Sequence, residues 1–174
     1  MVTLFRSYQR LSLIPFFIVA VILLSITACM NDYTVIDDMN DTSFSLVNQD
    51  SVEVSFPSDF KGEYVVMGFI YTHCPDICPL ITQNLIAIQK GLDYPDNVQF
   101  LGVSFDPERD TPAILHRYKE VFKLDTNFQL LTGEPAMVEQ FMDSVRVRTQ
   151  ISMQTTTESG QEIYFLNHSD KIMV

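Results

Sequence analysis

The nine residues Tyr71–Pro79, YTHCPDICP, contain two of the three cysteines of this chain, separated by three residues. The preceding segment, Tyr64–Ile70, is continuously apolar and β-prone, which is typical of a strand buried on both faces. The following segment, Leu80–Lys90, has helical spacing and predicts a helix, with Gly91 as its C-terminal stop. Open α/β sheets carry functional loops beyond the carboxyl ends of their strands, so the loop between these segments is the first candidate site.

The rest of the chain predicts further strands and helices around this unit. Before it, the alternating segments 43–47 and 52–56 predict a β-hairpin. After it, we expect strands at 98–104, 128–131 and 145–151, helices from Pro112 to about Phe122 and from Glu134 to about Met142, and a polar loop at 153–161. Alternating strands and helices predict an α/β domain with a central sheet.

The segment Asp106–Pro112, DPERDTP, connects the second central strand to the following helix. Asp110 or Thr111 is suited to cap the N–H groups at the start of that helix, and the proline that ends the segment suits its first turn. We expect Arg109 and Asp110 to brace this loop. The role of Asp106 is left open between bracing and support of the candidate site.

The first 28 residues predict a targeting signal. Two arginines, at positions 6 and 10, precede Leu11–Ala28, which is almost wholly apolar. The tetrapeptide that ends at Cys29, Ile-Thr-Ala-Cys, resembles the lipobox of bacterial lipoproteins, which implies cleavage before Cys29 and attachment of a lipid to its thiol. An uncleaved membrane anchor is the alternative, since an apolar run of 18 residues is near the lower limit for spanning a bilayer. Either outcome tethers the domain to the cell membrane on its extracytoplasmic side, which faces the periplasm in a Gram-negative cell.

These boundaries divide the chain into a signal peptide at 1–28, a flexible tether at 29–42 and one domain at 43–174. The formal net charge is −11, and loss of the signal removes both of its arginines and no acidic residue. Such an acidic surface repels phosphate backbones, so we do not expect nucleic acid as a partner. Cations or a basic protein surface are better matched to it.

Cys74 and Cys78 lie at i and i+4, so in a helical or near-helical turn their sulfur atoms face the same way. Cys78 falls at or near a helix N-terminus, where the macrodipole favours a thiolate. The pair is suited to a shared metal ion or to a disulfide bond. Structural zinc and iron–sulfur clusters need four protein ligands, whereas Cu(I) accepts two or three soft ligands and fits the available cysteines and histidines best.

Three motifs, in this order, resemble the Sco/SenC family: YTHCPDICP, then Ser104–Pro112 (SFDPERDTP), then Asn167-His168-Ser169. Sco/SenC proteins are membrane-anchored copper proteins of thioredoxin-like fold that help to assemble the dinuclear copper centre of cytochrome c oxidase. The likeness runs from about Phe44 to the end of the chain. It implies a thioredoxin-like α/β fold, in which helices flank a central mixed sheet and a β-hairpin comes first.

The resemblance also implies a ligand set. By position, the copper-binding residues of the family match Cys74, Cys78 and His168, for copper as Cu(I) or Cu(II), with a loop that brings His168 across to the cysteines. The other two histidines are expected not to bind the metal. His73 neighbours Cys74 in an extended stretch and so faces the opposite way, and His116 lies within a predicted helix.

Asp106 and Asn167 are candidates for orienting the ligands, and Asn167 departs from the family pattern. The family commonly has aspartate at this position, so here an uncharged amide stands beside His168. A second departure is that only six residues follow His168, where family members continue through further strands and a closing helix. We therefore expect a truncated or fragmentary chain in which a last strand and helix are missing.

The leading hypothesis is a membrane-tethered copper chaperone, with the copper-bearing subunit of cytochrome c oxidase or another copper chaperone as its partner. The alternative is a thiol–disulfide oxidoreductase that reduces partner cysteines in the same assembly pathway, with Cys74 and Cys78 as its redox-active pair. Against it, such enzymes usually carry two residues between their cysteines and have no need of His168. A peroxide-reducing thiol protein and a purely structural lipoprotein are weaker hypotheses, and the latter leaves three motifs unexplained.

Overall fold

The computed structural model describes residues 35, 38–93, 96–157, 160, 162–169 and 171–174. The predicted signal at 1–28 and Cys29 lie outside the described residues. Within the described part of the chain, no helix has both the length and the apolar composition needed to cross a membrane. Residues Asp37–Val174 form one unit, which holds the described strands and helices.

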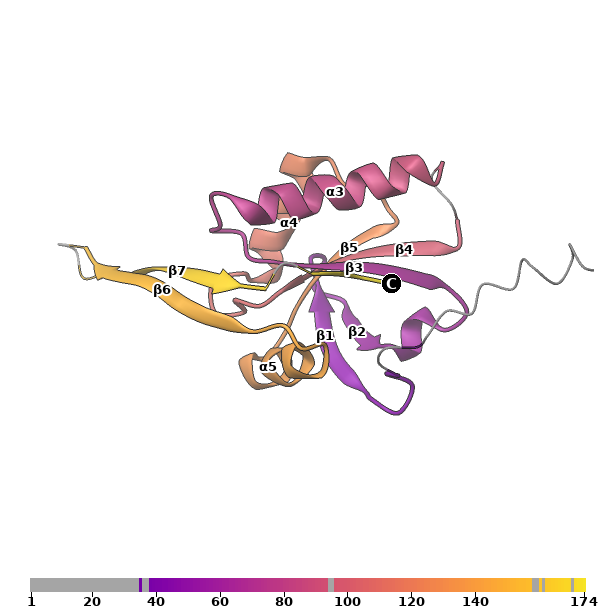
Figure 1. Cartoon of the computed structure of the whole chain (residues 1–174), viewed down its shortest axis with the longest axis horizontal. Helices are drawn as coiled ribbons and strands as arrows, with labels where there is room; N and C mark the ends of the chain where they lie inside the picture. Colours follow the sequence, from indigo (N-terminus) through magenta and orange to yellow (C-terminus); the bar gives the residue numbers. More distant parts are fainter. Residues whose placement is uncertain (1–34, 36–37, 94–95, 158–159, 161, 170) are drawn as a thin grey trace, which may run out of the picture. The chain divides into compact units, whose positions relative to one another are not determined.

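A six-stranded mixed sheet forms the centre of this unit. Its strands are β1 (Phe44–Asn48), β2 (Glu53–Phe56), β3 (Tyr64–Ile70), β4 (Val98–Ser104), β5 (Phe128–Thr132) and β8 (Ile172–Met173). They lie in the order β2-β1-β5-β4-β3-β8, as Figure 1 shows for the central strands. The strands β3, β4 and β5 run parallel, whereas β1, β2 and β8 run antiparallel to their neighbours. The predicted N-terminal hairpin and the predicted mixed sheet are confirmed.

Helices cover both faces of this sheet. They are α3 (Ile77–Gly91), α4 (Pro112–Phe122) and α5 (Pro135–Ser144), with a short 3₁₀ helix, η2, at Ser58–Phe60. Figure 1 shows α3 and α4 on one face and α5 on the other. Parallel neighbours need a crossover connection, and α3 supplies it between β3 and β4. The start of α3 therefore lies at the carboxyl end of the parallel strands.

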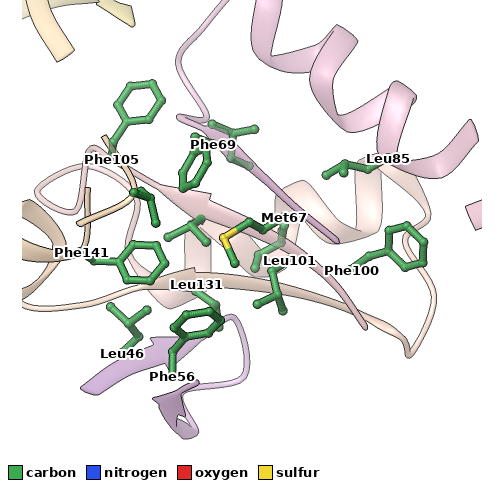
Figure 2. Close-up of a cluster of buried hydrophobic side chains, with 14 of the residues drawn as sticks. Leu46, Phe56, Met67, Phe69, Leu85, Phe100, Leu101, Phe105, Leu131 and Phe141 are labelled. Carbon is green, nitrogen blue, oxygen red and sulfur yellow. The ribbon is translucent and has the colours of Figure 1, made fainter. Parts of the chain in front are cut away.

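The face of the sheet that α5 covers is packed with large apolar side chains. Strand alternation puts Phe69, Leu101 and Leu131 of three neighbouring strands on this face, and Figure 2 shows them in one cluster with Phe141 of α5. None of these four side chains is exposed to solvent. This buried layer makes the sheet a rigid base for the loops at its carboxyl edge.

On the opposite face, α3 lies close to β3 because Gly68 has no side chain. A Cβ atom at Gly68 would lie 2.7 Å from Ile81 Cγ2 of α3. Gly102, its register partner on β4, meets a flexible side chain instead, since a Cβ there would lie 2.6 Å from Leu130 Cδ2. The glycine in β3 thus lets α3 pack directly on the strand that leads into the two-cysteine loop.

The predicted strand at 145–151 begins four residues too early, and the polar loop predicted at 153–161 is wrong over 153–156. The structure instead has β6 (Thr149–Thr156) and β7 (Glu162–His168), paired antiparallel as a separate two-stranded sheet. Val145 and Val147 alternate as in a strand, but both are buried in the connection that follows α5. Every residue of β6 is exposed, and the alternation with apolar residues at 145, 147, 151 and 153 does not show where the strand begins.

The predicted helix after the two cysteines begins earlier than expected and ends where predicted, within one residue. It starts at Ile77 instead of Leu80, so its first turn includes Cys78. Gly91 is the last residue of the helix, close to the predicted stop, and the left-handed residue after the helix is Asp93, with φ of 56°. The earlier start brings the helix N-terminus to the cysteines.

Candidate metal centre

Both cysteines lie where β3 passes into α3, and each sulfur atom accepts a backbone hydrogen bond. The N–H of Cys78 donates to Cys74 Sγ (3.4 Å), and the N–H of Tyr71 donates to Cys78 Sγ (3.4 Å). Asp76, the N-cap residue of α3, makes no side-chain cap hydrogen bond. The Cys74 sulfur therefore takes the place of a side-chain oxygen as the partner of an N–H group in the first turn.

The two thiols differ in burial and therefore in acidity. Cys78 is fully buried, and this burial raises the pKa of its thiol well above the ordinary value. Burial also acts to raise the pKa of the half-buried Cys74. The backbone N–H groups of Cys78, Asp76 and Ile77 outweigh it, so the pKa of Cys74 lies below its ordinary value. Cys74 is therefore the readier thiolate, and a bound cation nearby would help Cys78 to lose its proton.

His168 reaches the cysteines from the end of β7, 90 residues after Cys78 in the sequence. Its Nε2 atom lies 3.5 Å from Cys78 Sγ, and its Nδ1 atom lies 3.3 Å from the carbonyl oxygen of Ser169. A carbonyl oxygen can only accept, so Nδ1 carries the proton in this contact. The lone pair of Nε2 is then directed toward the cysteine side.

The structure brings the three predicted ligand residues together. The sulfur atoms of Cys74 and Cys78 and a ring nitrogen of His168 all lie within 4.8 Å of one another. In zinc sites, sulfur lies about 2.3 Å and nitrogen about 2.0 Å from the metal, so a sulfur and a nitrogen on one ion are at most about 4.3 Å apart. The 3.5 Å between Cys78 Sγ and His168 Nε2 satisfies this limit. Two thiols and an imidazole form a soft donor set that is suited to copper.

Two aromatic rings that the sequence did not single out pack against His168. The ring centroids of Phe105 and His168 are 4.6 Å apart, and those of Tyr71 and His168 are 6.3 Å apart. Both aromatic side chains are buried. A signal for them existed, because each follows directly after a parallel strand at the edge where α/β sheets carry their sites. They form an apolar wall behind the imidazole.

Asp110 connects the two-cysteine loop to the end of β4. It is fully buried and accepts hydrogen bonds from Ser104 Oγ (2.6 Å), from the N–H of Thr72 (2.9 Å) and from Thr72 Oγ1 (2.5 Å). Burial raises the pKa of this carboxyl group, although the same donors act to lower it. The bracing role of Asp110 is confirmed. Thr111, the other predicted cap, is the N-cap residue of α4, but it makes no side-chain cap hydrogen bond.

Asp106 and Asn167, predicted to orient the ligands, lie in different surroundings. Asp106 is buried and accepts hydrogen bonds from Arg109 Nε (2.5 Å) and from the Tyr164 hydroxyl group (2.8 Å). Asn167 is exposed and directly precedes His168 on β7, so the two side chains lie on opposite faces of that strand. A role of Asn167 in orienting the imidazole stays a prediction.

The other two histidines lie outside the group of two cysteines and one histidine. His116 Nδ1 lies 3.0 Å from Asp50 Oδ1 on the surface. His73 is exposed, and its ring groups with the carboxylates of Asp106 and Asp110, with ligand atoms within 4.8 Å of one another. Both carboxylates already accept hydrogen bonds from protein donors, so these three residues do not form an open metal site.

The comparison with known sequences now identifies the family. A sequence profile described as SCO1/SenC matches residues 36–174. The chain belongs to the SCO1/SenC family. The protein SCO2 homolog, mitochondrial, of Bos taurus is 36% identical over 107 residues, which cover 60% of this chain and 39% of that relative. The chain thus spans well under two thirds of the length of this SCO1/SenC relative.

Solved structures of the SCO1/SenC family share the fold. Arabidopsis thaliana ScoI with copper bound aligns with a TM-score of 0.61 and 32% identity, over 74% of this chain and 76% of that chain. Bradyrhizobium japonicum ScoI with copper bound aligns with a TM-score of 0.59 and 34% identity, over 75% of this chain and 78% of that chain. The predicted thioredoxin-like fold is confirmed.

Proposed function

We propose that this chain is a copper chaperone that carries one copper ion between Cys74, Cys78 and His168. The convergence of these two sulfur atoms and a ring nitrogen within 4.8 Å is the observation that carries the proposal. Two thiolates are sufficient ligands for Cu(I), and an added imidazole makes the site tolerant of Cu(II). Three protein ligands, with Cys74 only half-buried, leave room for an incoming ligand of a partner, as transfer by ligand exchange requires.

The partner that we propose is the copper-bearing subunit of cytochrome c oxidase, or a second chaperone that hands copper to it. Membership of the SCO1/SenC family supports this assignment. The predicted lipid at Cys29 would hold the chain to the cell membrane on the extracytoplasmic side, where such a partner is reached. Fractionation of cells that express Cys29→Ala tests the anchor, because the variant should leave the membrane fraction while wild type stays there.

An anaerobic Cu(I) titration of the purified full chain against a competing chelator tests the metal site. We expect one tightly bound copper per chain, lost in both Cys74→Ser and Cys78→Ser. His168→Ala should keep Cu(I) and lose Cu(II), because the imidazole is the harder of the three donors. His116→Ala is the matched control, since it removes an exposed imidazole outside the group. A folded wild-type chain that does not compete with the chelator would contradict the proposal.

The contrast between the two thiols favours one second candidate, a thiol–disulfide oxidoreductase. Cys74 is half-buried with a lowered pKa, and Cys78 is buried beside it, which is the arrangement of an attacking and a resolving thiol. The Cys74 thiolate would attack a partner disulfide and displace one partner thiol. Cys78 would then displace the second, so that the partner gains two thiols and this chain gains a disulfide. Intact reduction of a model disulfide by His168→Ala, together with lost Cu(II) binding, would favour this candidate.

A further inference from the structure

The position of His168 depends on how β7 is fastened to the rest of the domain. Tyr164, Leu166 and His168 alternate along β7, so the three side chains share one face of the strand. The paired strand, β6, is exposed throughout, and a groove of about 680 Å³ lies between this hairpin and α5. Packing against α5 therefore gives the hairpin little support, and the contacts of β7 must set its position.

Arg109 makes the principal polar contacts to β7. Its Nη1 donates to the carbonyl oxygen of Tyr164 (2.9 Å), and its guanidinium carbon lies 3.5 Å from the centroid of the Tyr164 ring. Its Nε donates to one oxygen of Asp106 (2.5 Å), while the Tyr164 hydroxyl group donates to the other (2.8 Å). Arg109, Asp106 and Tyr164 thus form a closed ring of contacts, which we name the β7 clamp.

A second attachment lies between the β7 clamp and the imidazole. The N–H of Leu166 donates to the hydroxyl oxygen of Tyr71 (3.2 Å), and the ring of Tyr71 packs against His168. The Arg109 guanidinium carbon lies 5.6 Å from the Tyr71 ring, so Arg109 sits against both tyrosines. Strands rise about 3.3 Å per residue, so the clamp at Tyr164 lies about 13 Å from His168 along a short, regular strand.

We propose that the β7 clamp positions His168 opposite the two cysteines and thereby sets how well the site accepts Cu(II) relative to Cu(I). This inference rests on the proposed copper function. Arg109 is a positioning residue in this proposal and acts through His168. The two cysteines alone suffice for Cu(I), so loosening of β7 weakens Cu(II) binding selectively.

The charge of Arg109 and its positioning role predict opposite changes in Cu(II) affinity for the same substitution. Arg109→Gln removes a positive charge near the site, which on Coulomb grounds alone should strengthen the binding of a divalent cation. Loss of the clamp should weaken it, because the imidazole is then less often in place. The direction of the change in Cu(II) affinity therefore separates the two effects.

The first measurement uses the metal-free full chain. Hydrogen exchange at the Leu166 amide reports whether β7 is held, because that N–H donates to Tyr71. We expect exchange to be faster by about tenfold or more in Arg109→Gln and unchanged in Arg117→Gln, which removes the same charge at an exposed position of α4. Unchanged exchange in Arg109→Gln would overturn the proposal, whatever the protein does with copper.

The second measurement compares Cu(I) and Cu(II) affinities by chelator competition. Replacing a residue that orients a metal ligand typically costs about 10–100-fold in affinity, so we expect Arg109→Gln to lose about tenfold for Cu(II) and to keep Cu(I) within about twofold. Arg109→Lys should recover only part of this loss, since an ammonium group lacks the planar fork that contacts Asp106 and Tyr164. Equal loss of both copper states would overturn the selective role.

The His168→Ala background distinguishes positioning from general destabilisation. This variant loses Cu(II), so the readout there is Cu(I): if Arg109 acts only through the imidazole, adding Arg109→Gln should leave Cu(I) affinity within about twofold. A larger loss of Cu(I) affinity in the double variant would overturn the proposal. Tyr164→Phe is the second variant in case Arg109→Gln fails to fold, because it keeps the ring and removes only the hydroxyl donor to Asp106. Tyr164→Phe should speed exchange at the Leu166 amide and weaken Cu(II) binding, each by a smaller factor than Arg109→Gln does.

Discussion

Asp110 ties the two-cysteine loop to the sheet, and its removal gives a sharp test of how the metal centre is supported. Its carboxylate receives one hydrogen bond from Ser104 at the end of β4 and two from Thr72, two residues before Cys74. Asp110→Ala would leave all three donors without this partner. The loop would then lose its direct connection to the end of the central strand.

The magnitude follows from the burial of the donors. Ser104 is fully buried, so its hydroxyl proton loses its acceptor, while Oγ still accepts from the N–H of Asp106 (3.1 Å); the unpaired donor costs about 1–3 kcal/mol. Thr72 is partly exposed, so water can replace the carboxylate there and the two donors together add only about 1 kcal/mol. The free energy of unfolding should therefore fall by about 2–4 kcal/mol at pH 7. Ser104→Ala should cost less, because Asp110 keeps both donors from Thr72.

Urea unfolding of the metal-free chain measures this loss, with Asp143→Ala as the control because Asp143 is exposed on α5. The control should change stability by no more than about 0.5 kcal/mol. A loss below about 1 kcal/mol in Asp110→Ala would refute the reasoning, since the buried donors would then have found other partners.

Three further predictions follow from the packing and from the acidity of individual groups. Burial raises the pKa of Asp110 above its unfolded value, so the stability that its protonated form provides is present at low pH and is lost as pH rises through the folded pKa. Urea unfolding from about pH 4 upward should therefore show that the deficit in unfolding free energy of Asp110→Asn relative to wild type shrinks as pH rises. Gly68→Ala should lower the unfolding free energy by about 1–3 kcal/mol and Gly102→Ala by less, because the first meets a stiff β-branched side chain and the second the rotatable end of a leucine; equal losses would contradict the packing argument. Iodoacetamide should label Cys74 at a rate that rises with pH through a pKa below the ordinary thiol value, because the thiolate is the reacting form. Cys78 is buried and should react only after unfolding. Labelled Cys78, detected by mass spectrometry in the folded chain at neutral pH, would disprove this.

The sequence predicts the half of the metal centre that depends on local structure. The apolar run Tyr64–Ile70 and the helical spacing after it correctly predict a buried strand and a helix on either side of the cysteines. The i, i+4 spacing of Cys74 and Cys78 brings their sulfur atoms close through the geometry of one turn. These features were accessible because each depends on residues that are close in the sequence.

The other half of the centre depends on contacts that are distant in the sequence. His168 lies 90 residues after Cys78, and only the family resemblance predicted that they meet. Residues 149–156 are exposed throughout, and the alternation of apolar and polar residues runs from Val145 to Met153, so it does not show where the hairpin that carries His168 begins. The contacts of Arg109 with Tyr164 could not be predicted either, because a charged residue that packs on a ring has no periodic signature in the sequence.

The two cysteines are held more firmly than His168, and this difference affects how copper would be transferred. The cysteine sulfurs are fixed by the buried junction of β3 and α3 and by backbone N–H groups, so they cannot move without disturbing the sheet. The imidazole of His168 lies at the end of a hairpin whose outer strand, β6, is exposed and whose inner strand the β7 clamp fastens to the domain. On the proposed function, a partner ligand should therefore displace His168 first, while both sulfurs still hold the metal. Copper would then leave by stepwise exchange, and it would never be released to water as a bare ion.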